Sequence, residues 1–305
     1  MLSRYESRRQ TLGYALAALS GCLLSTLGVL GKTAYALGAD PLSVVSLRAT
    51  IAGIILGIAV MATKPNLFRL RPADLPFFVG YGFVGVALNY LGYFYALEFT
   101  TVATAITVLY TYPAMVVVLA FIVYREPIVR LKIAALLLCF FGVVLVASGS
   151  SSAGLTSDPR GLMFSLLAGG STAVYIVAGK HVLTRYDAKT VLFYSFLFGS
   201  LALNVFRYVE LGPGLNVNTE IMLVIVAIAV IPTLLGYGVL TYSLQLIEAG
   251  RAAIASSIEP AVAICLAYLF LRETPSLIQL TGSVLVIIGA LLIGFSTASE
   301  KQSDR

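Results

Sequence analysis

Arg48 and Glu259 are charged residues within long apolar stretches of the sequence. A charge at the centre of a bilayer costs at least about 2.5–3.5 kcal/mol on insertion scales, so such residues are candidates for function. The guanidinium of Arg48 can bind a carboxylate, while the carboxylate of Glu259 can bind an amine or exchange a proton. Together they would suit a zwitterion such as an amino acid. The alternatives are that Arg48 extends to the lipid headgroups and that Glu259 is paired internally in a structural contact.

The sequence has 17 tyrosines and no tryptophan. Some tyrosines suit the membrane interface, whereas others, such as Tyr90 and Tyr110, lie deep in apolar stretches. Phenol rings with one polar tip suit a cavity for amphipathic solutes, although packing between helices is the alternative for most of them. Asn89 and Tyr93 are four residues apart and share one helix face. The candidate substrate-binding residues are therefore Glu259, Arg48, Asn89, Tyr93, Tyr112, Tyr175 and Tyr237.

Composition indicates the solvent in which these residues lie. Apolar residues make up 59% of the chain and charged residues 11%, whereas roughly 25% of a soluble domain is charged. The sequence has ten apolar stretches, and most of them are apolar on all sides. Their lengths are close to the roughly 20 residues that a helix needs to cross a bilayer. Their continuity argues against a membrane barrel, in whose strands apolar and polar residues alternate. We predict an all-α membrane protein with spans at about 11–34, 42–63, 74–97, 101–123, 131–148, 160–181, 190–208, 220–243, 251–271 and 276–296.

The second half of the sequence repeats the first at an offset of 147 residues, which places Pro260 on Pro113 and Glu273 on Glu126. Each repeat holds five apolar helices. Because five is an odd number, the second copy is expected to enter the membrane inverted relative to the first. Inverted repeats are a common plan of secondary transporters, with the binding site near the bilayer midplane.

The predicted domains are a first repeat at 1–148 with helices one to five, a linker at 149–159, a second repeat at 160–297 with helices six to ten, and a tail at 298–305. The linker is rich in Ser and Gly, which is typical of a flexible connector. Cysteines occur only inside apolar stretches and without metal-type spacing, so we expect neither a metal nor a cofactor.

The distribution of Lys and Arg predicts the orientation of the chain. With the N-terminus inside, 15 basic residues lie on the inner side and 4 on the outer side. Because basic residues favour the cytoplasmic side, both termini are expected there. The net charge of +6 is then a feature of topology and does not indicate nucleic-acid binding.

Pro113 and Pro260 fall in the middle of the fourth and ninth spans, where a proline removes a backbone hydrogen bond and bends the helix. Two equivalent kinks suit hinges, although they could instead only shape a cavity or the packing. Glu126 and Glu273 follow arginines at helix ends, and we expect both to be structural, accepting backbone N–H bonds at the start of the next helix, with a role in coupling as the alternative. Lys32, near the end of the first span, is expected to extend to the membrane surface.

The stretches 101–146 and 251–294 share one pattern: a helix rich in small residues, a proline in mid-helix, a glutamate at the next turn, and a final helix with glycine. Both resemble the repeats of the EamA family in the drug/metabolite transporter superfamily. This resemblance covers essentially the whole chain and implies ten helices as five plus five. It implies that helices one, three, four, six, eight and nine surround a cavity, while five and ten stand apart. It further implies a bacterial inner-membrane carrier, often an exporter of amino acids or other small metabolites.

Three classes of function compete. A secondary transporter that exports an amino acid or similar amphipathic solute by alternating access explains the repeats, the equivalent prolines and the sparse buried charges. A channel or a non-transporting scaffold is the alternative, although no filter-like segment or ring of charges occurs. An enzyme would need a catalytic set, and the sequence has no H-E-x-x-H, no P-loop and one histidine, His181. Proton coupling through Glu259 and facilitated exchange are both compatible with the sequence, which does not define an oligomeric state.

Overall fold

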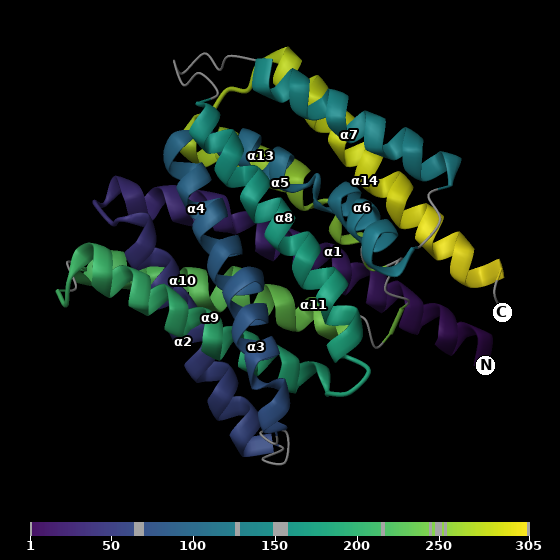
Figure 1. Ribbon diagram of the computed structural model, residues 1–305. Coiled ribbons are helices and arrows are strands. Elements are labelled where there is room, and N and C mark those ends of the chain that lie inside the picture. The colour runs from purple at the N-terminus through teal and green to yellow at the C-terminus, as the bar shows by residue number, and fades with distance from the viewer. Residues whose placement is uncertain are drawn as a thin grey trace.

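The computed structural model describes residues 2–63, 70–125, 129–148, 158–214, 217–243, 246–247, 252 and 255–303. The regular secondary structure of these residues is helical throughout (Figure 1). Eight helical stretches are long and apolar enough to cross a membrane, and two further apolar helices are shorter. The eight long stretches coincide with the first eight predicted spans. The all-helical fold is therefore confirmed, whereas the total of ten spans stays a prediction.

The first half of the chain forms α1 (Leu2–Ala36), α2 (Pro41–Thr63), the 3-10 turn η2 (Pro72–Asp74), α3 (Leu75–Gly82), the π-helical segment η3 (Phe83–Leu88), α4 (Asn89–Phe99), α5 (Val102–Leu109), α6 (Tyr112–Tyr124) and α7 (Arg130–Ser148). The second half forms α8 (Pro159–Val182), α9 (Ala188–Leu211), α10 (Thr219–Ile228), the π-helical segment η4 (Ala229–Gly236), α11 (Tyr237–Ser243), α13 (Glu259–Leu271) and α14 (Leu277–Ser303). Nearly all of the predicted linker lies outside the described residues.

The structure repeats at the same offset as the sequence. The π-helical segments η3 and η4 occupy equivalent positions in the third and eighth crossings. The helix of the fourth crossing is interrupted at 110–111, and a turn at 257–258 interrupts the equivalent place in the second half. Helices α6 and α13 both end at an arginine with left-handed backbone, Arg125 (φ 54°) and Arg272 (φ 55°). These shared irregularities extend the repeat from sequence to backbone conformation.

Pro113 and Pro260 lie at helix starts and not in the middle of continuous helices. Each is the second residue of its helix, α6 or α13, directly after the interruption. In the first turn of a helix the missing N–H of proline has no intrahelical partner to lose. Each crossing is therefore broken and restarted at the proline, which corrects the expectation of a simple kink. The role of these prolines as hinges stays a prediction.

Two equivalent sets of helices form most of the molecule. Helices α4, α5 and α6 pack on α8, and together with α3 and η3 we call them the α8 set. Helices α10, α11 and α13 pack on α1, and together with η4 we call them the α1 set. The pair α2 and α9 contacts both sets, while α7 and α14 lie side by side at one edge of the molecule (Figure 1).

The backbones of α7 and α14 meet at Gly142 and Gly282. A Cβ atom on Gly282 would lie 2.5 Å from the backbone oxygen of Gly142, and one on Gly142 would lie 2.7 Å from that of Gly282. Small residues permit such close contact in membranes, where packing replaces the hydrophobic drive between helices. This pair corresponds to the predicted fifth and tenth spans, which the family resemblance places apart from the others.

Candidate functional site

A cavity of about 360 Å³ lies between the two sets. This volume falls in the range of about 300–1,000 Å³ that is typical of small-molecule sites. Its wall includes residues of α1, η3, α4, α5, α6, α8, α11 and α13, as well as α2 and α9. The second and seventh crossings therefore join the six that the family resemblance places around a cavity. The contribution of α2 is Arg48.

All seven candidate substrate-binding residues line this cavity. Five helices of the two sets and α2 supply them: Arg48 from α2, Asn89 and Tyr93 from α4, Tyr112 from α6, Tyr175 from α8, Tyr237 from α11 and Glu259 from α13. The structure thus brings together residues that are far apart in the sequence. Their role in binding a substrate stays a prediction.

Four further polar residues at the cavity were not among the candidates: Tyr90, Tyr110, Thr172 and Ser256. The two tyrosines had the same signal as the chosen ones, since both lie deep in apolar stretches. Thr172 and Ser256 had none, because serine and threonine are ordinary residues where membrane helices pack closely.

Arg48 is almost completely buried, with 1% of its surface exposed. Its Nε atom donates a hydrogen bond to Thr233 Oγ1 at 2.9 Å. Its guanidinium carbon lies 3.9 Å from the centre of the Tyr90 ring and 5.4 Å from that of Phe94, within the range of cation–π contacts. Arg48 therefore turns toward the protein interior, which excludes its extension to the lipid headgroups.

Glu259 connects the two sets at the cavity. The hydroxyl of Tyr110, which lies at the interruption before α6, donates a hydrogen bond to Glu259 Oε2 at 2.8 Å. Glu259 thus has an internal partner and also faces the cavity. A carboxylate offers about four acceptor positions, so this single bond leaves capacity for an amine or a proton. The geometry is compatible with both the structural and the binding interpretation.

Neighbouring side chains are fixed by contacts between α4, α3 and α8. Asn89 Nδ2 donates hydrogen bonds to Thr172 Oγ1 at 2.7 Å and to the Ala168 carbonyl at 3.0 Å. Both donors of this amide are engaged, so its oxygen is the group with which it could contact a solute. The Tyr175 ring stacks on Tyr81 with 4.4 Å between ring centres. These contacts give the α8 side of the cavity a defined shape.

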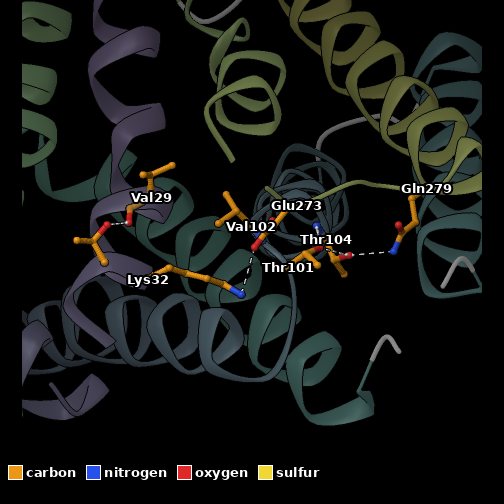
Figure 2. A network of polar contacts seen from close by, with 8 residues as sticks. Val29, Lys32, Thr101, Val102, Thr104, Glu273 and Gln279 are labelled. Carbon is orange, nitrogen blue, oxygen red and sulfur yellow. Dashed lines mark hydrogen bonds and ion pairs between the residues drawn. The ribbon is translucent and has the colours of Figure 1, made fainter. Parts of the chain in front are cut away.

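The direct contacts between the two sets gather at one end of the cavity, where α1 packs on α4 and α5, and α13 packs on α5. A Cβ atom on Gly28 would lie 2.5 Å from Val102 Cγ1 and 3.0 Å from the Tyr93 hydroxyl oxygen, so the α1 backbone covers this end. Figure 2 shows the polar contacts there. Glu273 Oε2 accepts a hydrogen bond from the Val102 backbone N–H at 2.8 Å, and Glu273 Oε1 lies 3.2 Å from Lys32 Nζ. We call Lys32, Val102 and Glu273 the Glu273 cluster.

The Glu273 cluster differs from the expectation in its partners. Glu273 accepts the backbone N–H at the start of α5, in the other half of the chain, and not that of the following helix α14. Lys32 pairs with Glu273 instead of extending to the membrane surface. Because Lys32 and Glu273 belong with the α1 set and Val102 with the α8 set, the cluster joins the sets. Glu126, the sequence counterpart of Glu273, lies outside the described residues.

The cavity extends toward the opposite end of the two sets. At the offset of the repeat, α8 is the counterpart of α1 and α11 is the counterpart of α4. Helix α1 packs on α4, but no comparable packing occurs between the described parts of α8 and α11. Instead, Ile176 of α8 and Leu240 of α11 both line the cavity, within two turns of the ends of their helices. Leu192, near the start of α9, lines it as well. Among the described residues, the two sets are therefore closed at the Glu273 cluster, and the cavity separates α8 from α11 at the other end.

The groups that the cavity offers are those that bind solutes directly: a guanidinium, a carboxylate, an amide and phenol rings. Within the described part of the chain, no three His, Cys, Asp or Glu side chains are grouped so that they could hold a metal ion. The three cysteines are free thiols.

Comparison with known proteins adds an independent observation. The model of the EamA-like transporter family matches the chain twice, at residues 11–148 and 159–295. An uncharacterized transporter of Clostridium kluyveri is 27% identical over 92% of both chains. An uncharacterized inner membrane transporter, YicL, of Salmonella typhimurium is 23% identical over 82% of this chain and 84% of its own. A crystal structure with 20% identity shares the fold, with a TM-score of 0.63 over 94% of this chain and 96% of that one.

The family model and the names of these relatives indicate a transporter, and the long apolar helices indicate an integral membrane protein. The two matches of the family model together cover most of the sequence. The chain belongs to the EamA-like transporter family, in the drug/metabolite transporter superfamily.

Proposed function

We propose that the protein is a secondary transporter that moves a small amphipathic metabolite, such as an amino acid, across the bacterial inner membrane by alternating access. The observation that carries this proposal is a cavity between two equivalent sets of helices that, among the described residues, pack together at the Glu273 cluster but not comparably between α8 and α11 at the opposite end. Such a cavity is what one state of an alternating-access transporter requires. Export is the direction that the family resemblance implies.

The proposal includes ten spans in two inverted repeats with both termini in the cytoplasm. The ninth span is α13 with 13 residues, preceded by helical residues at 255–256, which parallels the division of the fourth span into α5 and α6. In the orientation predicted from Lys and Arg, the Glu273 cluster faces outward and the opposite end of the cavity faces the cytoplasm. The arrangement described above is then the inward-open state.

Transport would require the two sets to rock against each other. The Glu273 cluster must separate to open the outer end, while α8 and α11 must meet to close the inner end. The interruptions before Pro113 and Pro260 are the proposed hinges, because the helical hydrogen-bond pattern is broken there in both sets. Motion of two bundles as rigid bodies, between one packed arrangement and another, is a usual form of conformational change.

Two sources of energy are compatible with the cavity: proton coupling through Glu259 and facilitated exchange. Replacing Glu259 by Gln distinguishes them in proteoliposomes, because Gln keeps the size and an acceptor oxygen but cannot exchange a proton. Coupling predicts that the variant loses the dependence of uptake on a pH gradient, while Glu98→Gln, an exposed acid of α4, keeps it. If Glu259→Gln retains the same dependence, Glu259 is not the coupling residue.

Counterflow tests the function itself. Purified protein in liposomes preloaded with unlabelled solute is screened with labelled amino acids, sugars and nucleosides. A transporter accumulates the labelled solute transiently and saturably when the same solute is inside. A channel shows flux without counterflow, and the absence of flux for every solute would contradict the proposal.

A further inference from the structure

Among the residues that the structure describes, Arg48 has a positive charge without an acidic partner at the wall of the cavity. None of the ion pairs found among the described residues includes it. Its Nη1 atom is buried and has no hydrogen-bond partner there. A charged group in this position is costly in a membrane and is usually retained for a substrate or ion. The anion that compensates Arg48 is then expected to come from the solute in the cavity.

Thr233 fixes the orientation of this guanidinium. Its hydroxyl donates a hydrogen bond to the Ile228 carbonyl at 2.9 Å, across the five-residue spacing of the π-helical segment η4. The hydroxyl has one hydrogen, which this bond uses, so Thr233 Oγ1 is left as an acceptor for Arg48 Nε. Thr233 therefore binds the inner edge of the guanidinium and cannot itself donate to an anion.

The aromatic rings of Tyr90 and Phe94 restrict Arg48 further, since they lie against the guanidinium at 3.9 and 5.4 Å. With Nε engaged by Thr233, the Nη atoms form the part of the fork that is able to bind a planar anion. At the offset of the repeat, the counterpart of Arg48 is Ser195 and that of Thr233 is Val86. The arrangement thus exists once in an otherwise duplicated scaffold, as expected for a group added for specificity.

We propose that Arg48 binds the carboxylate of the transported solute and that Thr233 is the positioning residue that sets the direction of this contact. The inference rests on the proposed function and deepens it by naming the substrate class: amphipathic solutes with a single carboxylate. One guanidinium compensates one negative charge, and Glu259 on the same cavity disfavours a second. The phenol rings receive the apolar part of the solute.

Matched pairs of probes test the proposal on purified protein in nanodiscs. L-phenylalanine and L-leucine are compared with phenylalaninamide and leucinamide, which lack the carboxylate, by equilibrium binding. The wild type is expected to bind at least one acid more tightly than its amide. Thr233→Val should weaken binding of the acid about tenfold, as for loss of a hydrogen bond to a charged group, and should change the amide little. Thr233→Ser should restore the preference, and Arg48→Gln should abolish it.

Thr50→Val is the matched control. Thr50 lies on α2, the helix of Arg48. Like that of Thr233, its hydroxyl donates a hydrogen bond to a helix carbonyl and accepts one from a side-chain N–H group, that of Asn204, but Thr50 does not line the cavity. Its variant is expected to keep the preference for the acid. The proposal is overturned if the wild type binds neither acid or prefers the amides. It is also overturned if Arg48→Gln or a folded Thr233→Val keeps the preference. Counterflow with no preference for carboxylates would contradict this inference alone, whereas loss of all flux contradicts the proposed function.

Discussion

Replacing Glu273 by Gln should release the closed end of the cavity. Glu273 is 6% exposed, and it holds the Val102 N–H at 2.8 Å and the Lys32 ammonium at 3.2 Å. Gln keeps an acceptor for Val102 but loses the charge and the ion pair. Hydrogen bonds to charged groups contribute about 1 kcal/mol more than neutral ones. With the lost ion pair, closure should weaken by about 1–2 kcal/mol, which shifts the ratio of open to closed molecules roughly 5–30-fold.

Accessibility of a cysteine in the cavity measures this shift. The three free cysteines of the protein are first replaced, and a single cysteine is then introduced as Leu27→Cys. Leu27 lines the cavity. A membrane-impermeant maleimide added to right-side-out vesicles should label Leu27→Cys roughly 5–30-fold faster in Glu273→Gln than in the parent. Lys32→Met should act in the same direction. The double variant should resemble the single variants, because both remove the same contact.

Asp158→Asn is the control for a change of charge. Asp158 also accepts a backbone N–H, that of Arg160 at 2.8 Å, and pairs with the guanidinium of the same residue at 2.7 Å. The hydrogen bond from this guanidinium holds the pKa of Asp158 below its usual value, so the carboxylate is ionised at neutral pH. This pair is confined to the start of α8, so its loss should leave labelling unchanged. Unchanged labelling in a folded Glu273→Gln variant would show that Glu273 does not hold this end of the cavity closed.

Three further predictions concern other contacts. Tyr110→Phe removes the hydrogen bond to Glu259 across the two sets and should raise the same labelling rate about fivefold, as for about 1 kcal/mol; an equal rate would contradict this. Gly282→Val should destabilise the protein by about 1–3 kcal/mol in thermal unfolding, because its Cβ meets a backbone oxygen of α7 at 2.5 Å. Gly238→Val, with no atom within 4 Å of the added Cβ, should change it little. Pro260→Ala should slow counterflow several-fold with a stability change below about 1 kcal/mol, and unchanged flux would exclude a hinge there.

Much of the fold could be predicted because each apolar stretch is long and continuous, and because lipid requires helical hydrogen bonding within a span. Backbone irregularities recur at the offset of the repeat, as Arg125 and Arg272 show. The π-helical segments and the helix interruptions were not predicted, since they leave the apolar pattern unchanged. Pro113 and Pro260 marked the place of the interruptions but not their form.

Cavity residues could be predicted where a charged side chain stands within an apolar stretch of the sequence, as for Arg48 and Glu259. Thr233 could not, because a threonine in a membrane helix usually bonds to its own backbone, and its contact with Arg48 depends on how α2 meets η4. The same limit applies to Lys32, whose partner Glu273 lies at the other end of the sequence. Pairings between distant helices depend on tertiary packing, which no local pattern encodes.

The proposed transport cycle requires two inverted repeats that enclose a cavity, which opens to one side of the membrane at a time. The turns at Arg125 and Arg272 end equivalent helices and test the inversion directly. In a background without other cysteines, Arg125→Cys and Arg272→Cys are each treated with an impermeant maleimide from either side of the membrane. If the repeats are inverted, Arg125→Cys is labelled only from the cytoplasmic side and Arg272→Cys only from outside. Labelling of both from the same side would contradict the inversion.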